Sequence, residues 1–147
     1  MLDQIGLNSG FSYEYFHYGP YSEDLAERVE DDVVFGHLSA SQRRRVSDGV
    51  PYVAYSATKT GDGDRLETHM PISRVRTALD EMQRHSATIL ELAATIHWLV
   101  AMEGVADWKA ELIRRKGAKT RDGRDLKAFE LLRTLGLPPA AGLAQQA

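Results

Sequence analysis

Residues 11–18 combine aromatic and polar side chains, and in an extended chain, where successive residues alternate between two faces, aromatic rings fall on both faces. The rings on one face are Phe11, Tyr13 and Tyr15, and those on the other are Phe16 and Tyr18. This pattern is typical of a β-strand. A second segment rich in strand formers, residues 50–58, is bounded by Gly and Asp. Because an isolated strand cannot satisfy its backbone, we predict that the two segments pair as a short two-stranded antiparallel sheet.

A sharp corner is expected after the first segment, at Gly19 and Pro20, because Gly tolerates unusual dihedral angles and Pro cannot continue a hydrogen-bonded ladder. Ser22 is placed to cap a helix over residues 23–35, where its hydroxyl can accept a hydrogen bond from an unpaired backbone N–H. The segment is therefore predicted to run as strand, corner and helix. We expect its rings to pack in the core, since aromatic clusters are common there.

Apolar residues at helical spacing predict further helices along the chain. One begins near Pro71, and another covers residues 108–116 after an Asp107 cap. The last runs over about residues 122–135. Residues 38–48 are polar and are expected to form a loop or a short helix.

The segment at residues 86–102 is apolar around nearly its whole circumference, so it is predicted to be a central helix that other elements surround. The fold class is therefore mainly α with a small β element (α+β), with about five helices around this central helix. The 147 residues suit one core, which predicts a single domain over residues 1–137 followed by a frayed C-terminal tail over 138–147.

The composition of the chain excludes several classes of function. The chain has no Cys, which excludes disulfides, thiolate nucleophiles and Cys-ligated metals. We find no signal peptide and no membrane-spanning segment in the sequence, so we expect a cytoplasmic protein that does not contact a membrane.

Charge is distributed unevenly along the chain. Residues 1–35 hold eight acidic residues and one basic residue, whereas residues 107–127 hold eight basic and four acidic residues. One interpretation is two solvated faces that attract each other within the fold. The other is a surface near the C-terminus that binds an anion or a partner.

Catalytic and metal-binding signals are weak. The only obvious candidates are the five histidines, His17, His37, His69, His85 and His97. No two of them have the spacing of a zinc-binding helix, and His97, in the central helix, is expected to be a buried, hydrogen-bonded residue. Residues 61–64 resemble part of a calcium loop but lack its later Glu, so we predict a turn there. We expect no enzyme activity, no catalytic residue, no metal and no cofactor.

Two stretches carry a family resemblance. The first contains Tyr18, Gly19, Pro20, Tyr21 and Ser22, with Leu25 three residues further on, and the second contains Thr95, His97 and Trp98. In this order they resemble the uncharacterised YwgA-type bacterial proteins and, more distantly, the SocA-like Panacea domain of antitoxins. The second stretch departs from the antitoxin motif, because it reads Ala-Thr-Ile-His-Trp instead of Thr-His followed by Pro-Trp.

The resemblance implies a mainly helical domain with a non-enzymatic role, in which a Panacea-like antitoxin neutralises a toxin by binding it or delivers it to a protease. Relatives begin with an apolar helix, of which residues 2–7 would be the remainder, so we hypothesise that the first helix is missing. We therefore predict a cytoplasmic protein-binding module whose partner is a protein such as a toxin. The alternative is a winged-helix-like DNA-binding or regulatory protein with a nucleic acid as partner.

Overall fold

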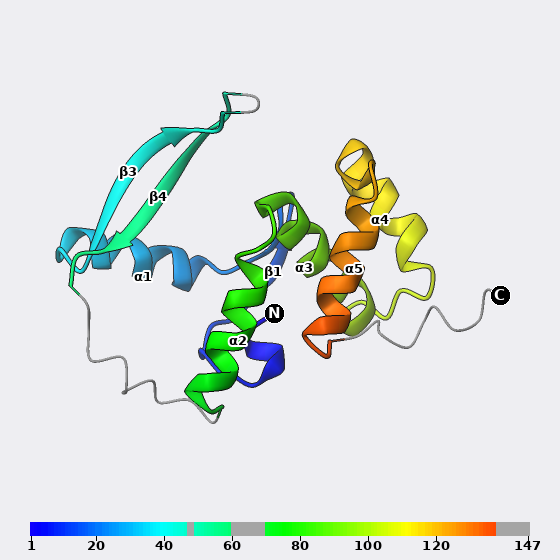
Figure 1. Ribbon diagram of the computed structural model, residues 1–147, viewed down its shortest axis with the longest axis horizontal. Helices are drawn as coiled ribbons and strands as arrows, with labels where there is room; N and C mark the ends of the chain where they lie inside the picture. The colour runs from blue at the N-terminus through cyan, green and yellow to red at the C-terminus, as the bar shows by residue number, and fades with distance from the viewer. Residues whose placement is uncertain (47–48, 60–69, 138–147) are drawn as a thin grey trace. The chain divides into compact units, whose positions relative to one another are not determined.

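The computed structural model describes residues 1–46, 49–59 and 70–137, and these residues confirm the predicted fold class (Figure 1). They form five α-helices, two short 3-10 helices and two separate two-stranded antiparallel sheets. The chain divides into two compact units, one made of Met1–Tyr21 with Glu67–Ala147 and the other of Ser22–Leu66. The single domain predicted over residues 1–137 stays a prediction, and the predicted tail at 138–147 lies outside the described residues.

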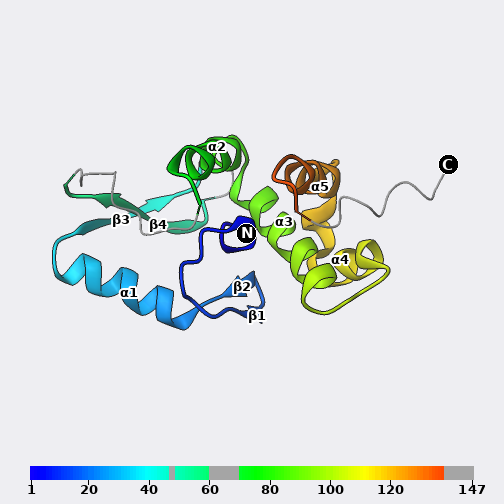
Figure 2. The same ribbon diagram turned by 90° about the horizontal axis from the view of Figure 1, so that it is seen from below.

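The first unit is built on helix α3 (Ala87–Ala101), which confirms the predicted central helix. Figure 2 shows α3 between α2 (Ile72–Met82) and the pair formed by α4 (Trp108–Lys116) and α5 (Arg124–Thr134). Side chains from α3, α4 and α5 make the core of this unit, and the fully buried ones include Leu92, Ile96, Leu99, Leu112 and Leu132. Because α3 is apolar on every side, it can be covered by several elements at once.

Local capping sets where these helices begin. The Ser86 hydroxyl accepts a hydrogen bond from the backbone N–H of Ile89, and the Asp107 carboxylate accepts one from Ala110 at 3.0 Å. Both satisfy donors that have no partner inside the helix. A short 3-10 helix, η2 (Gly117–Thr120), follows α4, and another, η1 (Asp3–Ile5), lies near the N-terminus. Pro71 precedes α2 as its N-cap and is not its first helical residue.

The predicted strand-corner-helix arrangement is wrong at the corner. Strand β1 (Glu14–Phe16) turns back through two residues into strand β2 (Gly19–Tyr21), and the pair is antiparallel with Tyr15 opposite Pro20. Gly19 and Pro20 therefore belong to the second strand of a hairpin. The physical reason is that Gly19 adopts φ = +112°, which lets the chain re-enter the ladder, while Pro20 is tolerated because β2 is an edge strand.

The second unit consists of helix α1 (Glu23–Val34) and a longer hairpin of strands β3 (Leu38–Arg44) and β4 (Pro51–Ala57). The predicted pairing of residues 11–18 with 50–58 is therefore wrong, and so is the loop or short helix at 38–48. Each predicted strand pairs with its neighbour in the chain, where a short loop costs less closure entropy than a distant pairing. The polar sequence Ser-Ala-Ser-Gln-Arg of β3 gave no strand signal by itself.

Within the described residues, no helix is long and apolar enough to cross a membrane. The turn predicted at residues 61–64 and the side chain of His69 lie outside the described part of the chain.

Candidate functional site

The β1–β2 hairpin packs closely on α3. Gly19 is buried, and a Cβ atom added there would lie 3.5 Å from the Thr95 hydroxyl oxygen and 3.9 Å from the Glu91 carbonyl oxygen. Thr95 is itself fully buried and donates a hydrogen bond to the same Glu91 carbonyl at 2.9 Å. The structure thus brings together Gly19 and Thr95, which come from the two stretches that carry the family resemblance.

A buried lysine fixes the turn of the hairpin. The Lys116 side chain is only 2% exposed, and its ammonium donates to the carbonyl of His17 at 2.9 Å and to the carboxylate of Glu91 at 2.8 Å. Lys119 completes the group by donating to both oxygens of Glu91. We call Glu91, Lys116, Lys119 and the carbonyl of His17 the Lys116 cluster. It joins the hairpin, α3, α4 and η2 through charge-assisted hydrogen bonds, which are stronger than neutral ones.

The ring of Tyr15 forms the inner contact of the hairpin. It lies 6.2 Å from the ring of Trp98, between centroids, and the guanidinium carbon of Arg115 lies 4.8 Å from its centroid. Cations at this distance from an aromatic face are attracted by its quadrupole. Tyr15 is therefore held by α3 on one side and by α4 on another.

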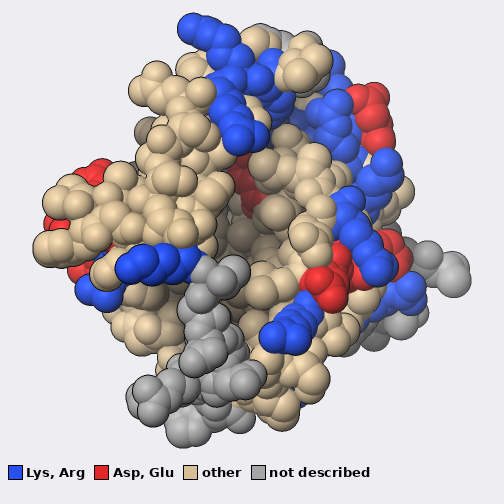
Figure 3. Space-filling model, turned by 60° about the vertical axis from the view of Figure 1, so that its left-hand side comes forward, with Lys and Arg blue, Asp and Glu red and all other residues tan. Residues whose placement is uncertain are grey.

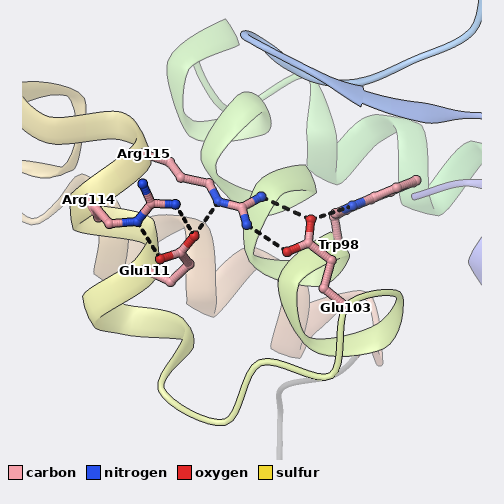
Figure 4. Close-up of polar contacts among 5 residues, drawn as sticks. All are labelled: Trp98, Glu103, Glu111, Arg114 and Arg115. Carbon is pink, nitrogen blue, oxygen red and sulfur yellow. Dashed lines mark hydrogen bonds and ion pairs between the residues drawn. The ribbon is translucent and has the colours of Figure 1, made fainter.

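Arg115 is itself fixed by two carboxylates (Figure 4). It donates two hydrogen bonds to Glu103, at 2.9 and 2.6 Å, and its Nε donates to Glu111 at 2.6 Å. Trp98 also donates to Glu103, through its indole N–H at 3.0 Å. A bidentate pair of this kind fixes the orientation of the guanidinium and also adds binding energy. The contacts of Tyr15 thus continue into a polar network that orients Arg115.

The arginines of this network favour the charged form of two of its carboxylates. Hydrogen bonds from Arg114 and Arg115 lower the pKa of Glu111 from its ordinary value of 4.5 to about 2. The hydrogen bonds from Arg115 also lower the pKa of Glu103. A general acid or base works best when its pKa lies near the working pH, which neither carboxylate satisfies.

The outer side of the hairpin exposes three aromatic rings, Phe16, Tyr18 and Tyr21, which we call the aromatic surface. Tyr18 is 80% exposed, Phe16 53% and Tyr21 45%. Phe16 and Tyr21 pack edge to face with centroids 5.4 Å apart, and the Lys119 ammonium lies 5.1 Å from the centroid of Tyr18. The expectation that the rings of this segment pack in the core is therefore wrong for these three, because a hairpin has two faces and α3 covers only one.

The remaining predicted site residues are placed as follows. His97 and Trp98 lie on α3, where His97 is buried and Trp98 contacts Tyr15. Ser22 caps α1 in the second unit by accepting a hydrogen bond from the backbone N–H of Leu25 at 3.3 Å. Leu25 thus contributes its backbone N–H to this cap, and Pro20 and Tyr21 lie in strand β2.

The histidines do not form a metal centre in the described part of the chain, where no group of three potential ligands was found. His37 lies 3.2 Å from a carboxylate oxygen of Asp32, and His85 lies 3.7 Å from one of Glu81.

The basic C-terminal segment makes many of its ion pairs with carboxylates of its own unit. The pairs are Lys116 and Lys119 with Glu91, Arg114 with Glu111, Arg115 with Glu103 and Glu111, and Arg124 with Asp122. On the face drawn in Figure 3, acidic side chains lie beside basic ones in several places. The winged-helix alternative rested on this segment, and these local pairs reduce the positive charge that it offers to DNA.

The Lys116 cluster was missed in the sequence, although two features pointed to it. Glu91 is an isolated charge in an otherwise apolar helix, and Lys116 directly precedes the glycine that ends α4. A charge in such a helix requires a partner, but the partner lies 25 residues away and only the fold brings it near.

Fold and site together define a mainly helical chain whose aromatic hairpin is held by a buried lysine and by ring contacts. The chain is similar to the uncharacterised protein YwgA of Bacillus subtilis (strain 168), at 30% identity over 93 residues. The match covers 62% of this chain and 54% of YwgA, so the chain matches about half the length of that relative. No protein-family profile matches the chain, and no solved structure matches it.

Proposed function

We propose that this protein is a non-enzymatic protein-binding module that recognises its partner through the aromatic surface. The observation that carries the proposal is the 80% exposure of Tyr18 on a hairpin whose turn is fixed by a buried lysine. Tyr residues are enriched among the residues that contribute most to protein–protein affinity. A surface already held in one conformation also loses less entropy on binding than a mobile one.

The partner that we propose is a toxin, which the protein would neutralise in the cytoplasm by binding or by presenting it to a protease. Support comes from the resemblance of the Tyr18 to Ser22 corner to the SocA-like Panacea domain of antitoxins. The contact between Gly19 and Thr95 adds to this support, since both stretches of the resemblance then belong to one packed feature.

Site-specific photo-crosslinking in the native host tests the binding surface. A benzophenone amino acid is placed at position 18 and, as a matched control, at position 35, where the aromatic Phe35 of the second unit is 72% exposed. We expect one defined protein to crosslink from position 18 and not from position 35. Equal crosslinking from both positions, or none from position 18, would overturn the proposed surface.

The toxin assignment has a separate test. The chain is co-expressed with the product of a small neighbouring reading frame that stops growth by itself, and colony formation is measured. We expect rescue by the unchanged chain and by Phe35→Ser, and loss of rescue with Tyr18→Ser. Absence of rescue by the unchanged chain would refute the antitoxin role while leaving the crosslinking result intact.

A further inference from the structure

The β3–β4 hairpin of the second unit presents an open strand edge. A hairpin of two strands is marginally stable without a third strand or a covering helix. Here α1 contacts β3, while β4 pairs with β3 and with no other strand among the described residues. Tyr52, Val53 and Tyr55 of β4 are each close to half exposed. Among the described residues, β4 therefore presents an open edge.

Hydrogen bonds at the two ends of the hairpin show which backbone groups point outward. The N–H of Thr58 donates to the carbonyl of His37 at 3.0 Å, and the N–H of Arg45 donates to the carbonyl of Val50 at 2.9 Å. Because inward and outward groups alternate along an antiparallel strand, Tyr52 and Ala54 point toward β3. The N–H and carbonyl groups of Val53 and Tyr55 therefore point away from it and are free to pair with a further strand.

The edge lacks most of the features that protect such strands from pairing. Natural edge strands are protected by charged side chains, bulges or prolines. The residues from Pro51 to Ala57 include no charged side chain, and the only proline stands at the first position of the strand. The outward N–H groups of Val53 and Tyr55 lie beyond it.

Two arginines of β3, which lie across β4 from this edge, have no carboxylate partner among the described residues. Arg43 donates to the Ser41 hydroxyl, and Arg44 donates to the carbonyl of Gly49. Neither makes an ion pair with any described residue, in contrast to Arg114 and Arg115 of α4. In the register of the hairpin, Arg43 stands opposite Tyr52 and Arg44 opposite Pro51. A side chain on an added strand beside Pro51 would lie on the same face as Arg44, two strand spacings or about 10 Å away, a gap that the long side chains of Arg and Glu span together.

We propose that the free edge of β4 binds an extended, acidic segment of a protein partner as an added β-strand. Backbone pairing with Val53 and Tyr55 supplies the affinity, and Arg43 and Arg44 select carboxylates. The inference rests on the proposed function because it too takes the partner to be a protein. The binding surface is different, since the edge of β4 is distinct from the aromatic surface. A nucleic acid fits less well, because it has no backbone N–H and carbonyl groups that could continue the ladder from Val53 and Tyr55.

The test uses the full chain with three probes: a short peptide that alternates Val and Glu, its counterpart that alternates Val and Lys, and single-stranded oligo-dT. Affinity is measured by fluorescence anisotropy, and amide exchange is followed by NMR. We expect the Glu peptide to bind and to slow exchange of the Val53 and Tyr55 amides about tenfold or more. Little change is expected at Ala54, whose amide already points toward β3.

Charge selection is tested with Arg43→Glu combined with Arg44→Glu, and Arg84→Glu, in the turn that follows α2, is the control. We expect the double variant to weaken binding of the Glu peptide about tenfold, and the control to leave it unchanged. Tighter binding of oligo-dT than of the Glu peptide, equal binding of the Glu and Lys peptides, or unchanged exchange at Val53 would overturn the inference. A dimer of the free chain that already protects Val53 would also overturn it, in favour of a second copy. Crosslinking from position 18 is independent of these outcomes, so the two proposals fail separately.

Discussion

Replacing Lys116 by Met removes the ammonium that joins the hairpin to α3 and α4 while keeping most of the side-chain volume. Breaking a buried ion pair by removing one partner costs about 3–5 kcal/mol, mainly because the remaining charge is left uncompensated. Here Lys119 stays within 2.8 Å of Glu91, so that carboxylate keeps a partner. The carbonyl of His17, by contrast, loses its hydrogen bond to a charged group, which is worth about 1.5–3 kcal/mol. We therefore expect a loss of about 3 kcal/mol of unfolding free energy.

For a chain of this length, such a loss lowers the melting temperature by about 6–12 °C. The assay is thermal unfolding followed by circular dichroism, with amide exchange of the hairpin as a second readout. Lys119→Met is the matched control, since its side chain is 41% exposed and an exposed ion pair contributes only about 0–1 kcal/mol. Equal melting temperatures for the two variants would refute the reasoning that burial makes Lys116 the critical residue.

Three further outcomes follow from the same geometry. Gly19→Ala is expected to destabilise the protein more than Gly10→Ala in thermal unfolding, because the φ of +112° at Gly19 lies further than the +80° at Gly10 from the left-handed region at about +57°; equal losses would contradict this reasoning. Glu111 has a pKa held at about 2, below its ordinary 4.5, so its contribution to stability is present above pH 4.5 and is lost as the pH falls toward 2. Glu111→Gln should therefore flatten the pH dependence of unfolding in that window, and an unchanged profile would contradict the cause assigned to the pKa. Tyr18→Ser should leave the melting temperature within about 1 °C of the unchanged chain, because this exposed side chain lies outside the core, and a larger loss would show a structural role.

Local signals in the sequence predicted the helical part of the fold well. The uniform apolarity of residues 86–102 identified the central helix, and the caps at Ser22 and Asp107 identified where α1 and α4 begin. These features are decided within a few residues of chain, by burial and by hydrogen bonds to neighbouring backbone groups.

Strand pairing and the site could not be read in the same way. The two aromatic, strand-forming segments appeared to be natural partners, yet each pairs with a segment that lacks a strong strand pattern. Gly19-Pro20-Tyr21 reads as a corner and β3 reads as polar, and only the ladder with an adjacent strand makes either one extended. The link between Lys116 and the carbonyl of His17 spans 99 residues, and no spacing rule connects such positions.

The rings around Gly19 and Pro20 do not all pack in the core, as the sequence suggested. They divide between an inner and an outer face of the β1–β2 hairpin. Tyr15 faces inward and contacts Trp98 and Arg115, and Lys116 donates a hydrogen bond to the carbonyl of His17 in the turn. The inner face of the hairpin therefore attaches it to the helices. The rings of the outer half are exposed, with only Lys119 beside Tyr18 among the described contacts, because the alternation along the strands points them away from α3. Changes at the attachment should therefore lower stability first and binding only as a consequence, whereas changes at Tyr18 should lower binding alone. Loss of binding without loss of stability in a Tyr18 variant would therefore distinguish a binding surface from aromatic rings that are exposed without a function.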